Sequence, residues 1–369
     1  MSLRETFSFI LPDGSDRPIA DICKEYAKEC NKKILFCILM CILSAALFLI
    51  TLGVGTYDIS IPDAIRTFFD HILGNPVDPE DDYYVWGETI GRVPRAIGAV
   101  IAGIGLSIGG VIMQNILRNP LAEPYTMGIS SGAMFGATLN IGLGISLIPF
   151  LTGNYASIGN AFILSLIPLS IIVAISVFRK VTPVMMVLTG IAIMYLFDAI
   201  TQIVMVTSSS ETMQNIYMWG IGSLVRFNWD RIPLVAAIVF ALSITLYFCS
   251  KYLDVMYTGE RSAQSLGLRV NFFRVAVLIL TSLLTAAIVC TTGAIGFIGL
   301  VAPHIARIFV GSVNRYLIPA SAAFGVMFLL LADTVAKAMG GLPVGVFSSL
   351  IGGPLFLYIL IKQRRNAWM

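Results

Sequence analysis

Few side chains in this sequence could do chemistry, and the first is a carboxylate inside an apolar stretch. Asp198 lies within residues 183–206, which otherwise read as a membrane span. A carboxylate is costly in lipid, so its side chain should face the protein interior or a watery path. Thr201 and Gln202 follow three and four residues later and share its helix face. The three residues could line a translocation path or form a hydrogen-bonded contact between helices, and the sequence leaves both open.

His304 and Asp333 also lie in apolar stretches. The only other histidine is His71, so we expect no metal site, and a packing or hydrogen-bonding role is favoured for His304. Asp333 precedes Lys337 by four residues, a spacing that allows an ion pair along one helix. Paired carboxylates, a Ser/His/Asp set and a G-x-x-x-x-G-K-[ST] loop do not occur. We therefore expect no catalytic residue, cofactor or ATP site, and a chain that is not an enzyme on its own.

A polar island in the second half of the chain suits protein docking. Residues 251–274 separate two apolar runs, 232–250 and 272–290, each long enough to cross a bilayer. The spacing over 260–266 predicts a short helix, which Gly267 can end in the left-handed conformation. Such a compact loop indicates a surface on which a cytoplasmic partner acts. The alternative is a solvated connection between two spans.

The composition places these residues in a membrane. Of the 369 residues, 57% are hydrophobic and 12% are charged, whereas about a quarter of a soluble protein is charged. The sequence predicts an all-α polytopic membrane protein with its charges in loops and no nucleic-acid partner. None of the six cysteines lies in a segment predicted to be outside, so we expect no disulfide.

Apolar segments divide the chain into a polar extension and a membrane domain. Residues 1–33 should be a cytoplasmic N-terminal extension, with an amphipathic helix over 20–33 and no signal-peptide pattern. Residues 34–369 should form the transmembrane domain, with a short re-entrant helix near 219–224. The expected spans are 34–55, 93–117, 125–148, 158–178, 183–206, 232–250, 272–290, 293–310, 316–336 and 343–361.

Basic residues orient these ten transmembrane helices. With both termini in the cytoplasm, eighteen of the 24 lysines and arginines fall inside and six outside, as the positive-inside rule requires. Each half holds a span that leads through a Gly- and Pro-broken segment into a short span, over 93–133 and 272–307. Five spans per half make the halves inverted, a frequent transporter architecture.

Four motifs resemble one known family. They are RVPRAIGAVIAGIGLSIGGVIMQNILRNPLAEPYTMGISSGA at 92–133, GERSAQSLG at 259–267, GAIGFIGLVAPHIAR at 293–307 and LPVGV at 342–346. In this order they are similar to the signatures of FecCD-type permeases, the membrane subunits of type II ABC importers for iron-siderophores, haem and cobalamin. The resemblance extends from about 34 to 361 and leaves 1–33 outside.

The resemblance implies the type II ABC importer permease fold and a set of partners. These are two ATP-binding-cassette ATPase subunits, a second permease subunit, an extracytoplasmic solute-binding protein and membrane lipid. For the two permease subunits, a homodimer is favoured. The implied location is the bacterial cytoplasmic membrane, with multiple passes and both termini cytoplasmic.

The resemblance also implies roles for particular residues. Coupling to the ATPase falls to Gly259, Glu260, Ala263, Leu266 and Gly267, with Leu266 as an apolar knob and Gly267 as a tight turn. Docking of the binding protein falls to Arg92, Arg95 and Lys337; Lys337 keeps the charge of the family's frequent Arg but loses its planar fork. Anchoring of helix ends is the alternative for these three. The cytoplasmic gate falls at Thr182, Pro183 and Val184, within 180–184.

The function expected on this basis is ATP-driven import of an iron chelate, a siderophore complex, across the cytoplasmic membrane. Haem or cobalamin are the alternatives within the same class. An ion-coupled secondary transporter that uses Asp198 is a rival, but it leaves the 259–267 loop unexplained. An intramembrane enzyme is a second rival, for which only Asp198, His304 and Asp333 are candidates.

Overall fold

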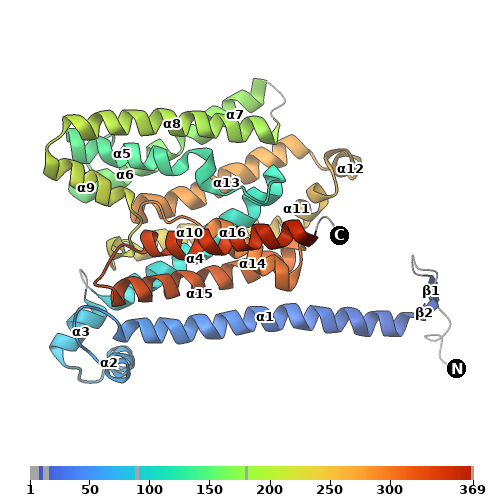
Figure 1. Cartoon of the computed structure of the whole chain (residues 1–369), viewed down its shortest axis with the longest axis horizontal. Helices are drawn as coiled ribbons and strands as arrows, with labels where there is room; N and C mark the ends of the chain where they lie inside the picture. Colours follow the sequence, from blue (N-terminus) through green and yellow to red (C-terminus); the bar gives the residue numbers. More distant parts are fainter. Residues whose placement is uncertain (1–7, 11–15, 88–90, 179–181, 367–369) are drawn as a thin grey trace.

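The computed structural model describes residues 8–10, 16–87, 91–178 and 182–366. Its secondary structure is helical apart from one short hairpin, and loops join the helices (Figure 1). In the hairpin, β1 (Ser8–Ile10) pairs antiparallel with β2 (Asp16–Pro18). The first half holds α1 (Ile19–Gly53), α2 (Ile61–Leu73), α3 (Pro79–Trp86), α4 (Arg92–Leu117), η1 (Pro124–Met127), α5 (Ile129–Leu143), α6 (Gly153–Ser165), α7 (Ile167–Phe178) and α8 (Pro183–Thr207). The second holds α9 (Ser210–Gly220), η2 (Leu224–Arg226), α10 (Ile232–Phe248), α11 (Ser250–Tyr257), α12 (Glu260–Ser265), α13 (Val270–Thr292), α14 (Ile298–Val310), α15 (Asn314–Ala338) and α16 (Val344–Asn366).

The helices give the ten crossings that the sequence predicts. Among the described residues, six spans are long and apolar enough to cross a membrane: α1, α4, α6 with α7, α8, α13 and α15. The pair α10 and α11, bent by 50°, makes a seventh. The shorter helices α5, α14 and α16 complete the set.

The helix α1 differs from its prediction. It is one helix of 35 residues, about 52 Å long at 1.5 Å per residue, where the sequence suggested a separate amphipathic helix over 20–33. The separate helix is wrong because no Gly or Pro interrupts residues 19–52. Since a hydrocarbon core is about 30 Å thick, α1 projects from the bundle at the end that also holds α12 and the end of α16 (Figure 1).

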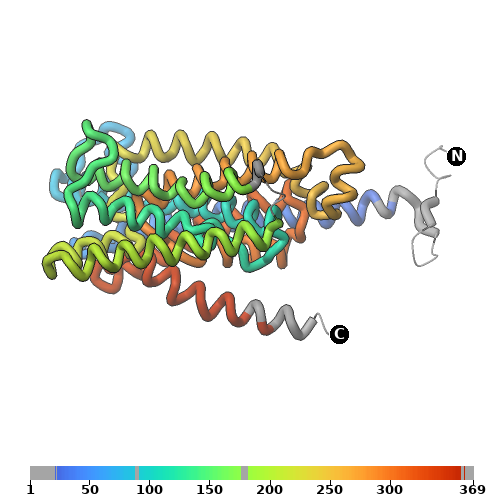
Figure 2. The backbone as a smooth tube through the Cα atoms, turned by 90° about the horizontal axis from the view of Figure 1, so that it is seen from above, coloured from blue at the N-terminus to red at the C-terminus, as the bar shows by residue number. Residues whose placement is uncertain are grey.

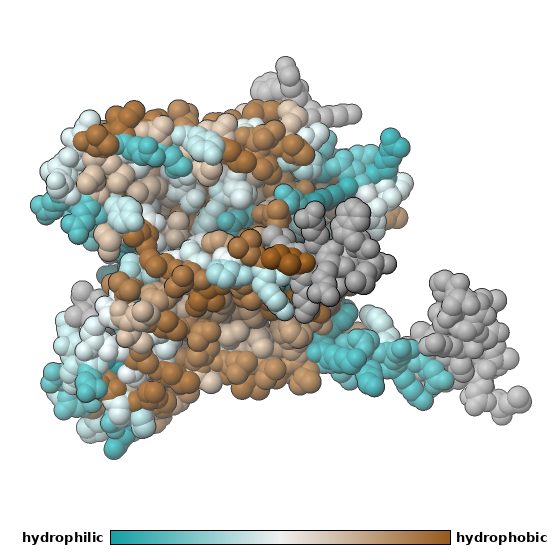
Figure 3. Space-filling model, in the orientation of Figure 1, coloured by the Kyte–Doolittle hydropathy of each residue, from teal (hydrophilic) through white to brown (hydrophobic). Residues whose placement is uncertain are grey.

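Polar surface lies at the two ends of the bundle. Figure 3 shows apolar side chains over its middle, and hydrophilic ones at the α2 and α3 end and along the projecting part of α1. The helix α2 forms within the acidic loop because Ser60 accepts from the backbone of Asp63, Pro62 occupies the first turn, and Gly74 ends the helix at φ 73°.

Helix contacts repeat between the two halves. The helix α4 packs on α14 and α15, and α13 packs on α5 and α6 in the same relation. The helix α5 packs on α6 as α14 packs on α15. The repeated contacts agree with two inverted five-helix halves in which α4 and α13 correspond.

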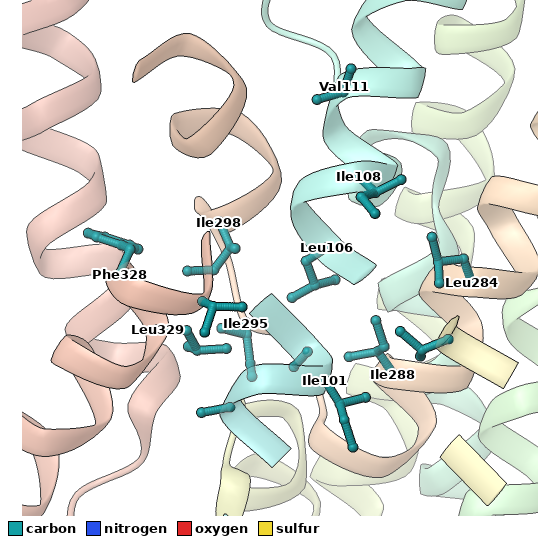
Figure 4. Close-up of a cluster of buried hydrophobic side chains, with 14 of the residues drawn as sticks. Ile101, Leu106, Ile108, Val111, Leu284, Ile288, Ile295, Ile298, Phe328 and Leu329 are labelled. Carbon is teal, nitrogen blue, oxygen red and sulfur yellow. The ribbon is translucent and has the colours of Figure 1, made fainter. Parts of the chain in front are cut away.

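The helix α4 is the centre of the bundle, and 83% of its most apolar stretch is buried. Figure 4 shows its side chains, among them Ile101 and Leu106, between those of α13 and α15. Glycines let the neighbours come close: a Cβ on Gly110 would lie 1.8 Å from the carbonyl oxygen of Gly299 in α14. A Cβ on Gly103 would lie 2.8 Å from the Cα of Val326 in α15. Small residues allow such packing in lipid.

The re-entrant helix expected near 219–224 is wrong in position. The helix α9 instead occupies 210–220, because the hydroxyl of Ser209 caps its start by accepting from Thr212. The chain after it is extended and hydrogen-bonds to the end of α13 and the segment that follows: Ser223 N donates to Thr292 O at 2.7 Å, and Gly222 N donates to Ala294 O at 3.1 Å.

We predict that Gly110→Ala destabilises the fold, because the added Cβ must displace backbone of α14. Overpacking of this kind costs about 1–3 kcal/mol, so thermal unfolding of the purified chain should begin at a lower temperature. Gly353→Ala in α16 is the control, since its Cβ would meet only Phe297 Cζ at 3.7 Å. Equal melting temperatures for the two variants would contradict this packing.

Candidate functional site

The loop between α10 and α13 is a small rigid unit. Gly259 precedes α12 at φ 125° and Gly267 follows it at φ 86°, conformations that favour glycine. Gly267 therefore ends α12 as predicted. The helix buries Ala263 against Met256 and Val270, the three residues of a separate small core. The loop thus has its own packing and is more than a solvated connection.

The exposed side of α12 carries an apolar residue. Leu266, which follows the helix, has 71% of its surface exposed. Singly exposed leucines are common on protein surfaces, so the informative feature is the place of Leu266 on a rigid polar loop. The geometry agrees with the apolar knob expected at this position.

An ion pair fixes α12 to the next span. The guanidinium of Arg274 in α13 donates to Glu260 Oε1 at 2.5 Å, and the Arg274 side chain is only 3% exposed. A buried cation needs such a partner. Glu260 is therefore a structural link between α12 and α13 as well as a predicted coupling residue.

Further hydrogen bonds tie α11 to the core helices. Asp254 Oδ1 accepts from the side chain of Asn314 at 2.7 Å, and Asn115 Nδ2 donates to Asn314 Oδ1 at 3.0 Å. Arg118, just after α4, donates to Met256 O at 2.7 Å. These hydrogen bonds connect α11 to α15 and to the end of α4. Sequence reasoning missed this network, although Asn115 and Asn314 at the ends of apolar helices were a signal for it.

At the opposite end of the bundle, the predicted docking residues come together around Asp333. Arg95 Nε donates to Asp333 Oδ1 at 2.8 Å, and Lys337 Nζ lies 3.4 Å from Asp333 Oδ2, which confirms the expected i,i+4 ion pair. Lys337 Nζ also donates to Thr51 Oγ1 at 3.1 Å. Two cations therefore share one carboxylate, and Arg92 lines the same small cavity without a bond to Asp333 among the described residues.

Exposure separates the three cations. Arg92 and Lys337 are each 5% exposed, whereas the side chain of Arg95 is 13% exposed. Arg92 donates to the carbonyl oxygens of Leu52 and Tyr57, so it anchors the end of α1. All three line a cavity of about 80 Å³ near Tyr84. In this subunit the structure therefore favours anchoring for Arg92 and Lys337, and docking by this cluster stays a prediction.

The predicted path residues lie on α8. Asp198 is half-buried, and its carboxylate accepts no hydrogen bond within the described residues. Thr201 is buried and Gln202 is exposed, so the three residues cross from the packed face of α8 to its open face. The absence of a bonded partner does not support a structural contact for Asp198, and lining of a path stays a prediction.

The predicted gate lies at the start of α8. Thr182 caps the helix, its hydroxyl accepting from Met185 N at 3.3 Å, and Pro183 occupies the first turn. Val184 is 66% exposed. Residues 180 and 181 of the expected segment lie outside the described part of the chain. The exposed residues indicate a face of α8 that is open in a single subunit.

His304 is buried as a packing residue. Its Nδ1 lies 3.0 Å from Leu300 O, and its ring meets the edge of the Phe356 ring. Among the described residues, no group of three His, Cys, Asp or Glu side chains could hold a metal ion.

Ten crossings in two inverted halves, with a rigid structured loop between the sixth and seventh, agree with the expected permease subunit of an ABC importer. Comparisons with known proteins place it more closely. The family model of the FecCD transport family matches residues 42–362. The chain belongs to the FecCD transport family.

Relatives span nearly the whole chain. A putative ABC transporter permease of Methanocaldococcus jannaschii is 36% identical over 94% of this chain and 99% of its own length. The hemin transport system permease of Yersinia pestis is 36% identical over 74% of this chain and 83% of its own. Other relatives are named as permeases for Fe(3+)-citrate, cobalamin and molybdate import.

A solved structure has the same fold. It is described as an inward-facing conformation of a putative metal-chelate type ABC transporter, and it matches with a TM-score of 0.77 and 28% identity. The match covers 88% of this chain and 98% of the other.

We predict that Asp333→Asn destabilises this end of the bundle, because it leaves Arg95 and Lys337 without their buried counter-charge. Breaking a buried ion pair from one side costs about 3–5 kcal/mol, which thermal unfolding would detect. The double variant Asp333→Asn/Lys337→Met should recover part of the loss, since it removes one unpaired cation. A single variant as stable as the wild type would show that the cluster contributes nothing.

Proposed function

We propose that the chain is the membrane-spanning subunit of an importer that moves an iron chelate, such as a siderophore complex, into the cell. The observation that carries the coupling part of this proposal is Leu266, exposed on a loop that is fixed by Glu260 and Arg274. The iron cargo is supported by relatives named for hemin and Fe(3+)-citrate and by a similar structure described as a metal-chelate type transporter. Cobalamin, also represented among the relatives, is the competing cargo.

Two ATPase subunits would bind at α12, one on each permease. In this proposal Gly259, Glu260, Ala263, Leu266 and Gly267 form the contact unit. Leu266 enters an apolar groove of the ATPase, and the remaining four hold α12 rigid. Closure of the nucleotide-bound ATPases then moves α12. The Asp254–Asn314–Asn115 hydrogen bonds and Arg118 pass the motion to α4 and α15.

A second copy of the permease would cover the open face of α8. The face is apolar and exposed, with Val184, Leu188, Tyr195, Leu196 and Ile203 between 59% and 67% exposed. Two copies joined here would enclose a path between them. Asp198, Thr201 and Gln202 would border that path, and Thr182, Pro183 and Val184 would narrow its cytoplasmic end by excluding water.

A solute-binding protein would dock at the opposite end. Arg95, the least buried of the three cations, is the contact group in this proposal. Arg92 and Lys337 hold the helix ends beside it and add positive charge that attracts acidic side chains. The arrangement puts α12 and both chain ends in the cytoplasm, and the membrane is the bacterial cytoplasmic membrane.

We predict that Leu266→Ser weakens binding of the ATPase subunits without unfolding the permease. Leu266 is exposed, so its replacement removes an apolar contact to the partner and no internal contact. Co-purification of the ATPase with the full-length permease would measure the loss, expected at about tenfold for one buried leucine at an interface. Leu73→Ser is the matched control, because Leu73 in α2 is equally exposed at 71% but lies at the opposite end. Similar losses for both variants would argue against α12 as the contact.

We predict that deletion of the gene abolishes uptake of radiolabelled iron bound to one siderophore. Wild-type chain should restore the uptake, and the Leu266→Ser variant should not. Haem and cobalamin uptake, measured in the same cells, test the cargo. Loss of one of these in place of siderophore iron would replace the iron-siderophore assignment. Uptake that persists with the ATPase partner inactivated would overturn the ATP-driven mechanism.

A further inference from the structure

A crevice opens between two helices that do not carry the proposed path. The helices α6 and α10 both pack on α13, which forms the floor between them. The space has a volume of about 350 Å³. Its apolar walls come from Tyr155 and Phe162 of α6 and from Leu234 and Ile238 of α10, and Ala287 lies on its floor. The crevice is thus a long apolar slot in the side of the bundle.

The mouth of the crevice carries one cation and one anion, Arg231 and Asp230. Arg231 Nη1 donates to Arg226 O at 2.8 Å, and its guanidinium lies over the Tyr155 ring. Arg231 Nε is buried and has no hydrogen-bond partner among the described residues. No salt bridge joins Arg231 to Asp230 within the described part of the chain, so both charges are available to a ligand.

A second arginine, Arg226, contacts Arg231 through its carbonyl oxygen but is not among the residues that line the crevice. Burial, and then repulsion from Arg231, lowers the pKa of Arg226 to about 10. Arg226 Nη1 is also buried without a partner in the described residues. Buried donors of this kind are normally satisfied by an acceptor. For Arg231 Nε, which belongs to a residue that lines the crevice, the phosphate of a ligand at the mouth would be such an acceptor.

The crevice lies at the depth of a membrane interface. Trp229 precedes the two charged residues, stacks on Trp86 and donates from Nε1 to Trp86 O at 2.7 Å. Tryptophans gather where lipid headgroups meet the acyl chains. From this level the slot descends along α10 from Arg231 to Ile238, into the apolar band.

The crevice also faces away from the surface that would join two permeases. Figure 2 shows α10 along one edge of the molecule and α8 with α16 along the opposite edge. Leu234, with 67% of its surface exposed, and Phe240 and Ile244 mark the open side of α10 as apolar. A second subunit on α8 would therefore leave this side in contact with lipid.

We propose that the crevice between α6 and α10 binds one phospholipid of the outer leaflet with a primary-amine headgroup, phosphatidylethanolamine. Arg231 holds the phosphate, Asp230 accepts from the ammonium, and one acyl chain fills the apolar slot. The pairing of one cation with one anion matches a zwitterionic headgroup better than an anionic one. Such a lipid adds to the contact between α6 and the start of α10 that Arg231 makes with the Tyr155 ring.

Photo-crosslinking of the full-length permease in nanodiscs tests the site. The probe is phosphatidylethanolamine with a diazirine in its acyl chain, and the crosslinked peptides are identified by mass spectrometry. Adducts should concentrate on 153–165 and 232–248. The same diazirine on phosphatidylglycerol should label these peptides several-fold less.

Variants separate headgroup from chain. Arg231→Gln should lower the crevice adducts about tenfold, because one charge-assisted hydrogen bond to phosphate is lost. Asp230→Asn should remove the preference for phosphatidylethanolamine over phosphatidylglycerol. Arg66→Gln is the control, since Arg66 is an exposed arginine of α2 at the same end. If Arg231→Gln does not fold, Ile238→Trp blocks the slot and leaves the mouth intact, and it should also remove the adducts.

Three results would overturn the proposal. The first is labelling spread evenly over the lipid-facing helices. The second is equal labelling by the two headgroups in the wild type. The third is unchanged labelling in both Arg231→Gln and Ile238→Trp. None of these outcomes depends on the cargo or on the ATPase.

Discussion

The close approach of α4 to its neighbours is the constraint on which the rest of the structure depends. At Gly110 and Gly103 the backbones of α14 and α15 occupy the space of a side chain. In lipid there is little hydrophobic gain from bringing helices together, so contact of this closeness provides the packing energy. Because α4 also contacts α13 and α10, its position determines where these helices of the second half pack. This close approach is the structural reason why α4 is rich in small residues.

Close packing at α4 also permits broken helices inside the bundle. The segment 293–297 between α13 and α14 has free backbone groups, which lipid could not satisfy. Protein groups satisfy them: Ile295 N donates to the hydroxyl of Tyr125, and Gly222 N donates to Ala294 O. Gly345 N in turn donates to Gly222 O. The irregular segments of the two halves thus hydrogen-bond to protein groups inside the bundle, where lipid does not reach them.

Local patterns in the sequence predicted most of the fold and part of the site. Hydropathy gave the ten crossings, and glycine chemistry gave the end of α12 at Gly267, because both depend on neighbours in the chain. The spacing of Asp333 and Lys337 gave their ion pair for the same reason. The partner of Arg95 could not be predicted, since α4 and α15 meet only after folding. The burial of Arg92 and the hydrogen bonds around Asn314 could not be predicted either, because they depend on residues far apart in sequence.

The two ends of the bundle are built differently, and the difference fits the two kinds of partner proposed for them. At α12 a buried arginine and a small apolar core hold one exposed leucine rigidly, so force on that leucine moves α13 as a body. At the other end Arg95 and Lys337 share the single carboxylate of Asp333, which neutralises only part of the charge of these two cations. Apolar contact on a rigid support suits a partner that stays and pushes. Unbalanced charge suits one that arrives, delivers and leaves, since charge raises the rate of encounter more than the lifetime of the complex.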